Sequence, residues 1–153
     1  MVQGLVRLIL LTTLFLLTAL SGCALTPTSQ QNAQPVSAET ELSGSPALSL
    51  LQRADQARSQ GDLAAAGRYL ERAMGVAPDS SWLYQSLARL RLQQGDAHGA
   101  EGLALRALRL APDNNDYRAD LWELVATCRA RQGNQNGADQ ARQQAEQLRE
   151  THA

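Results

Sequence analysis

The chain has 153 residues, of which 44% are hydrophobic and 19% are charged, and its formal net charge at pH 7 is −1. A protein that binds nucleic acid needs a basic excess to neutralise phosphates, so this balance argues against a nucleic-acid partner. All 14 basic residues are arginines. That choice suits carboxylate recognition, but the codon bias of a GC-rich genome explains it more simply.

Residues 1–22 have the pattern of a secretion signal. Arg7 is the only early charge, and residues 8–20 are apolar apart from three threonines. Such a segment is too short to span a bilayer of about 30 Å comfortably as a helix. The sequence LSGC at 20–23 resembles the bacterial lipobox. That resemblance implies removal of the signal before Cys23 and acylation of this residue. An ordinary secretion signal with an incidental cysteine, or an uncleaved anchor, is the alternative.

The acylated cysteine implies a membrane anchor. Two or more acyl chains hold a protein stably at one leaflet, whereas one chain holds it only marginally. In the lipoprotein family an aspartate after the cysteine favours retention in the inner membrane, and here Ala24 stands there. We therefore expect the periplasmic leaflet of the outer membrane, with the inner membrane as the alternative. Segment 23–46 contains Thr, Ser, Gln, Asn and Pro and predicts a disordered linker that reaches roughly 25–30 Å.

The remaining residues, 47–153, predict one small domain that repeats itself. Residues 60–79 align without a gap with residues 94–113, so that Gly61 and Gly95 lie 34 residues apart. A 34-residue period with Gly-Asp in the middle and Ala-Pro at the end is typical of helix-turn-helix solenoid units. The stretch resembles the tetratricopeptide repeat. The resemblance implies an all-α fold, a short α-solenoid of three units at about 47–80, 81–114 and 115–150.

Apolar spacing and capping residues predict these helices independently of the family. One stripe at steps of three and four is formed by Leu63, Ala66, Leu70, Ala73 and Ala77. Asp62 and Asp96 stand where an N-cap would satisfy free amides of each second helix. The third unit is offset, because Gly133 follows Gly95 by 38 residues. We expect the insertion to lengthen the turn or the first helix around residues 114–118.

No residue pattern predicts catalysis, a cofactor or a metal. His98 and His152 are far apart and have no ligand at metal-binding spacing. The sequence DNND at 113–116 lacks the glycine and the glutamate of an EF-hand, so a turn with helix-capping residues is the better interpretation. Cys128 lies on an apolar helix stripe and is expected to be buried and inert, rather than a redox thiol. We therefore expect a protein that is not an enzyme.

The family resemblance also implies a partner-binding groove, lined by the first helix of each unit. Carried over residue by residue, the groove positions are Leu48, Leu51, Asp55, Arg58, Trp82, Gln85, Arg89, Leu92, Asp120, Glu123, Thr127 and Arg131. Trp82 and Arg89 lie seven residues apart on one helix face and belong to the residue types that dominate binding hot spots. The alternative is that Trp82 packs on the neighbouring repeat.

These features predict a lipid-anchored adaptor that binds a protein or peptide during envelope or surface-machinery assembly. The membrane would be engaged through the acyl chains on Cys23. A self-associating structural envelope protein, hence a homo-oligomer, is one alternative, because three repeats leave end surfaces free. A regulator of peptidoglycan enzymes is another.

Overall fold

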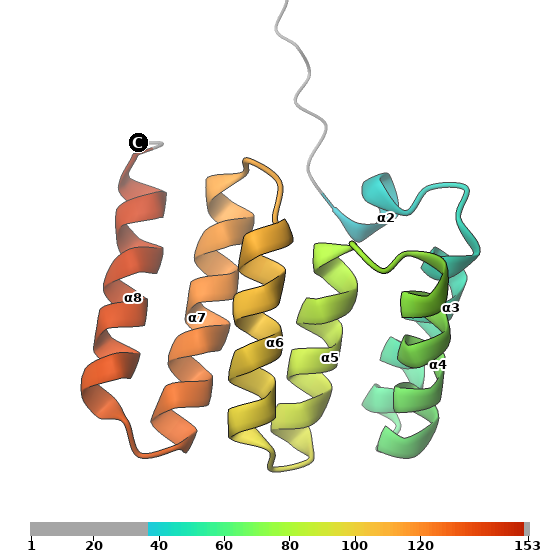
Figure 1. The fold of residues 1–153 in the computed structure, drawn as a ribbon, viewed down its shortest axis with the longest axis horizontal. Helices are drawn as coiled ribbons and strands as arrows, with labels where there is room; N and C mark the ends of the chain where they lie inside the picture. Colours follow the sequence, from blue (N-terminus) through green and yellow to red (C-terminus); the bar gives the residue numbers. More distant parts are fainter. Residues whose placement is uncertain (1–36, 152–153) are drawn as a thin grey trace, which may run out of the picture. The chain divides into compact units, whose positions relative to one another are not determined.

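The structure is a computed structural model that describes residues 37–151 (Figure 1). These residues form helices joined by short connections, and no strand occurs among them. The helices are α2 (Ala38–Glu41), α3 (Pro46–Ser59), α4 (Leu63–Val76), α5 (Ser81–Gln93), α6 (Ala97–Leu110), α7 (Asn115–Arg131) and α8 (Gln135–Glu150). Within the described range, no helix is both long and apolar enough to cross a membrane. The predicted signal peptide, Cys23, most of the linker and His152 lie outside the described residues.

The long helices pack as three consecutive pairs. α3 packs on α4, α5 on α6 and α7 on α8, and each pair also contacts the next through α4 with α5 and α6 with α7. Figure 1 shows α5, α6, α7 and α8 side by side in chain order. The predicted all-α solenoid of three helix-turn-helix units is therefore confirmed.

The turn inside each pair has one design, a glycine at positive φ followed directly by an Asp or Asn. The three turns are Gly61–Asp62, Gly95–Asp96 and Gly133–Asn134, and their glycine φ angles are 81°, 85° and 80°. In each turn the Asp or Asn side chain accepts a hydrogen bond of 2.8 or 2.9 Å from the backbone N–H three residues later. This bond satisfies an amide that the first turn of a helix otherwise leaves unpaired.

Replacing Gly95 by alanine is expected to destabilise the domain. Nothing lies within 4 Å of a Cβ added at this position, so the cost arises from the backbone, whose φ is 85°. Holding a residue other than glycine in this region costs on the order of 1–3 kcal/mol. Gly102→Ala is the matched control, because Gly102 lies inside α6 with equally open space, and alanine favours a helix there. Thermal unfolding followed by circular dichroism should move in opposite directions for the two variants. A shift of the same sign in both would contradict the role given to the turn.

The insertion in the third unit lengthens its first helix. α7 has 17 residues, whereas the equivalent α5 has 13. Asn114 caps α7 with a 2.8 Å hydrogen bond from the Tyr117 N–H to its side-chain oxygen. The DNND sequence is therefore a helix cap, as the sequence indicates. The added turn also brings Tyr117 into the interface between the second and third units.

Small residues allow the helices to approach closely. Alanine at the same place near the start of each second helix is fully buried, at Ala66, Ala100 and Ala138. A larger side chain here would push the paired helices apart, because protein interiors are close-packed. The repeat thus depends on these alanines for helix spacing, and on leucines such as Leu70 and Leu90 for apolar bulk.

Ordered structure begins before the predicted domain start at Ala47. The short helix α2 precedes it, and Leu42 is only 4% exposed within the core of the first unit. Ser45 caps α3, with Pro46 as its first residue. The last residues of the predicted linker therefore belong to the folded domain, because Leu42 contributes an apolar side chain to its core.

Candidate protein-interaction surface

The predicted groove positions lie on α3, α5 and α7, the first helix of each pair. Three of them are buried, with exposures of 4% for Leu51, 4% for Gln85 and 8% for Leu92. Their side chains belong to the packing between helices, so their assignment to an open binding surface needs correction. Leu48 is half-buried against the core of the first unit. The apolar groove positions of the first unit and two positions of the second thus pack inward in this short domain.

Trp82 packs on the neighbouring repeat, which is the alternative that the sequence leaves open. Its ring stacks on Tyr117 of α7, with centroids 3.7 Å apart and an interplanar angle of 22°. The Tyr117 hydroxyl lies 2.8 Å from Ser81 Oγ and donates to it, because Ser81 donates its own hydrogen to the Ala107 carbonyl at 2.9 Å. Burial raises the pKa of Tyr117 above its ordinary value. The aromatic stack and the Ser81–Tyr117 hydrogen bond join the second unit to the third.

The acidic groove positions are already paired within the protein. Arg149 of α8 lies 3.3 Å from both Asp120 and Glu123 of α7. On α3, Asp55 and Arg58 form their own ion pair at 3.3 Å. These carboxylates are therefore partly neutralised, so none offers an unopposed negative charge to a partner.

Two of the charged groove positions, both arginines, are exposed and have no ion-pair partner among the described residues. Arg89 on α5 and Arg131 on α7 are exposed, and no ion pair is found for either within residues 37–151. Thr127 is also exposed, although its hydroxyl donates a hydrogen bond of 2.9 Å to the Glu123 carbonyl. Two unpaired guanidiniums favour an acidic partner, because arginine binds carboxylates through paired donors.

A polar network that the sequence analysis missed joins α6 to α7. Arg129 Nε lies 2.7 Å from one oxygen of Glu101, and Gln132 Nε2 lies 2.9 Å from the other. Gln132 also donates to the Ala97 carbonyl, and Arg129 to the Gly137 carbonyl. Burial alone would raise the pKa of Glu101, but the hydrogen bonds from Arg129 and Gln132 outweigh it, and the pKa is lowered. The recurring Arg-x-x-Gln-Gly sequence at 91–95 and 129–133 is the signal that could have found this network.

The described residues contain no cluster of side chains suited to metal binding, and their one cysteine is buried. No group of three or more His, Cys, Asp or Glu residues between 37 and 151 is placed to hold a metal ion. Cys128 is fully buried, and burial raises the pKa of its thiol to about 11. A thiol with this pKa is protonated at neutral pH and therefore a poor nucleophile. Cys128 is a core residue, as the sequence predicts.

Comparison with known proteins supports the repeat architecture. The tetratricopeptide repeat family matches residues 57–126. The solved globular C-terminal domain of P. aeruginosa LpoP is 44% identical in sequence, with a TM-score of 0.64, and the match covers 66% of this chain and 95% of that one. No curated protein sequence matches significantly. The helix pairs, the glycine turns and these two matches agree, and the chain belongs to the tetratricopeptide-repeat proteins of Gram-negative bacteria.

Proposed function

We propose that this protein is a lipid-anchored periplasmic adaptor, which binds an acidic segment of an envelope protein through the first helices of its repeats. The observation that carries the proposal is the pair of exposed, unpaired arginines, Arg89 and Arg131, on α5 and α7. Tetratricopeptide repeats commonly supply extended surfaces for protein partners, and the likeness to the LpoP domain supports the repeat fold. The role is non-catalytic, because it requires only complementary contacts.

The location is proposed from the sequence before the domain. The LSGC sequence ends at Cys23, and Ala24 follows it, which favours an acyl anchor in the periplasmic leaflet of the outer membrane. Segment 24–36 has neither an acidic nor a basic residue, so it would not compete with an acidic partner for Arg89 and Arg131. The anchor would confine the helical domain near the membrane and raise its effective concentration for partners there.

The proposal is tested by reversing the charge of the surface in the full chain. Cells producing the double variant Arg89→Glu, Arg131→Glu are cross-linked, and the proteins that co-purify are compared with those of the unchanged chain. We expect at least one envelope protein to be lost, since like charges that face each other in an interface cost several kcal/mol. The control is Arg72→Glu with Arg109→Glu, which changes the net charge equally at exposed positions of α4 and α6.

The results separate the adaptor from its alternatives. Loss of a partner in the first double variant but not in the control supports the proposed surface, whereas identical partners in all three samples would exclude it. Light scattering on the purified full chain in detergent addresses self-association. A particle containing one chain supports the adaptor, and a stable dimer that depends on Arg89 and Arg131 would favour the structural alternative. Recovery of a peptidoglycan enzyme as the lost partner would specify the envelope process.

A further inference from the structure

The two interfaces between successive units can be compared residue by residue. A shift of 34 residues relates α4 to α6, and a shift of 38 relates α5 to α7. By these shifts Arg91 corresponds to Arg129 and Gln94 to Gln132. These residues end their helices in the same Arg-x-x-Gln-Gly sequence. In the second interface, Arg129 and Gln132 both bind the carboxylate of Glu101. The residue equivalent to Glu101 in the first interface is Gly67.

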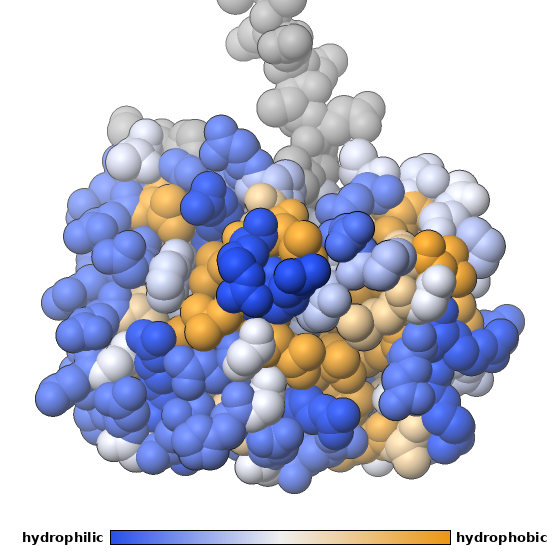
Figure 2. Space-filling view, in the orientation of Figure 1, coloured by the Kyte–Doolittle hydropathy of each residue, from blue (hydrophilic) through white to orange (hydrophobic). Residues whose placement is uncertain are grey.

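Absence of that side chain leaves a pocket between α4 and α5. It has a volume of about 180 Å³ and is lined by Leu63, Ala64, Gly67, Arg68, Glu71, Leu87, Leu90, Arg91 and Gln94. Figure 2 shows apolar surface exposed on the face of the molecule where α5 and α4 meet. The pocket thus combines apolar side chains such as Leu87 and Leu90 with Arg91 and Gln94, the counterparts of the residues that bind a carboxylate in the next interface.

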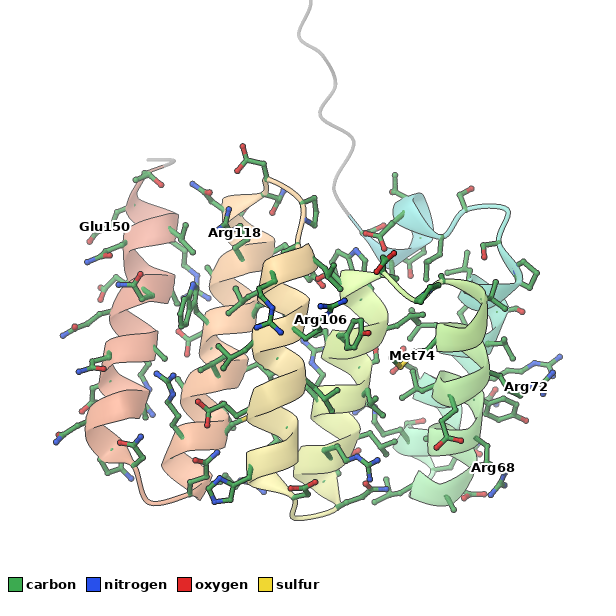
Figure 3. The ribbon with its side chains drawn as sticks, in the orientation of Figure 1. Arg68, Arg72, Met74, Arg106, Arg118 and Glu150 are labelled. Atoms are coloured by element: carbon green, nitrogen blue, oxygen red, sulfur yellow. The ribbon has the colours of Figure 1, made fainter. Side chains whose placement is uncertain are left out.

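No carboxylate satisfies Arg91 within residues 37–151. Its guanidinium instead donates to the side-chain oxygen of Gln94 at 3.2 Å. Glu71 lines the pocket but forms no ion pair with any other residue that the structure describes. The 38-residue shift places Arg91 like Arg129, and Arg68 of α4 also lines the pocket. Figure 3 shows Arg72 extending from α4 on the side away from α5. Residues 1–36 contain no Asp or Glu, so a side-chain carboxylate cannot come from that segment.

We propose that the pocket between α4 and α5 binds a glutamate or aspartate side chain of a protein partner, in the place that Glu101 occupies in the next interface. The carboxylate would accept hydrogen bonds from Arg91 and Gln94, and a neighbouring apolar residue of the partner would lie against Leu87 and Leu90. The inference rests on the proposed protein-binding function, but the pocket is separate from the Arg89 and Arg131 surface. The inference therefore adds a second contact with the partner, in which a carboxylate binds Arg91 and Gln94.

A side chain supplied by the protein itself tests the geometry. A Cβ added to Gly67 would meet only Leu90 Cδ2, at an ordinary distance of 3.7 Å, so position 67 accepts a substitution. Gly67→Glu restores the equivalent of Glu101, and Gly67→Gln has nearly the same size and helix propensity but no charge. We expect Gly67→Glu to melt higher than Gly67→Gln by roughly 4 °C, because a charge-assisted hydrogen bond is the stronger one. The control Gly102→Glu against Gly102→Gln should show a smaller difference, since position 102 is open and the new carboxylate has only a surface pair with Arg106 one turn away.

The intermolecular contact is tested with a defined probe. The ¹⁵N-labelled full chain in nonionic detergent is titrated with the acetylated and amidated peptide Ala-Leu-Glu-Leu-Ala, and in parallel with its glutamine counterpart. We expect saturable shifts of the Arg91 Nε–H and Gln94 side-chain amide signals, with affinity in about the millimolar range and on the order of tenfold weaker for the glutamine peptide. Gly67→Glu should abolish these shifts, and Glu71→Gln should strengthen them by removing a competing carboxylate.

The outcomes distinguish the pocket from the adaptor proposal. Equal shifts with both peptides, or shifts that persist in Gly67→Glu, would overturn the carboxylate site even if Arg89 and Arg131 prove to bind a partner. A lower melting temperature for Glu71→Gln would show that Glu71 already supplies the carboxylate, and would overturn it too. Specific peptide binding in a chain without any cellular partner would support the pocket while excluding the adaptor.

Discussion

Replacement of Tyr117 by alanine is expected to remove a large part of the stability of the domain. The Tyr117 ring is 4% exposed and stacks on Trp82, and the cluster around it includes Ala107 and Leu121. Truncation of a large buried aromatic residue costs about 3–5 kcal/mol, out of the 5–15 kcal/mol typical of a whole domain. The melting temperature of the full chain, measured by circular dichroism, should fall by roughly 15 °C or more.

The conservative variant separates the ring from its hydroxyl. Tyr117→Phe retains the stack and loses only the hydrogen bond with Ser81, whose own hydroxyl still donates to Ala107. We therefore expect a loss of about 1 kcal/mol. Trp82→Ala removes the other half of the stack and should destabilise far more than this, because Trp82 is a packing residue in this structure. A melting temperature near that of the parent for both Tyr117→Ala and Trp82→Ala would show that the interface between the second and third units contributes little.

Cys23→Ser is expected to release the protein from the membrane or to leave an unprocessed precursor. Each buried methylene of an acyl chain contributes about 0.8 kcal/mol, and two or more chains are needed for stable anchoring. A serine cannot form the thioether on which this anchor depends. Cys128→Ser is the matched control, because Cys128 lies buried in the core and its replacement should leave the membrane fraction unchanged.

Fractionation and the mass of the mature chain are the measurements. Ala24→Asp adds a test of location, since an aspartate after the acylated cysteine should move the protein toward the inner-membrane fraction. If Cys23→Ser has the same mature mass and the same membrane fraction as the parent, the lipoprotein interpretation fails. If both cysteine variants are missing from the membrane fraction, the cause is misfolding rather than a missing anchor.

Local sequence signals predicted the backbone design of this protein well. The adjacent residues Gly95 and Asp96 are enough to predict a turn between helices, since Gly95 adopts a positive φ and Asp96 caps the next helix. The four-residue offset before Gly133 predicted extra length at the start of the third unit, and α7 contains it. Such features depend on short stretches of chain, so they can be read without knowledge of tertiary contacts.

Contacts between units were harder to predict. α2 is only four residues long, too short for a periodic pattern, yet it leads to the buried Leu42. The family position of Trp82 implied an exposed groove, but the inserted residues bring Tyr117 against its ring. Gln85 is polar, and only the packing of neighbouring helices shows that it is buried. The sequence lacks the relative placement of helices on which these outcomes depend.

The pocket beside Gly67 is another feature between units that the sequence alone did not predict. The alignment of the repeats already pairs Gly67 with Glu101, but nothing in it shows that Glu101 binds residues of the following unit. The hydrogen bonds from Arg129 and Gln132 reveal that role, and the empty counterpart then becomes visible. The missing carboxylate beside Gly67 is therefore recognised only by comparison with the interface in which Glu101 supplies one.

The central claim is that the first helices of the repeats contact another protein, and site-specific photo-cross-linking in living cells tests it most directly. A photoreactive residue replaces the exposed Thr127 on α7 in one full-length chain and the exposed Gln143 on α8 in another. Illumination should give a discrete adduct from position 127, containing this chain and a different envelope protein, and little from position 143. Absence of any adduct at 127, or an adduct that contains only two copies of this chain, would contradict the adaptor account.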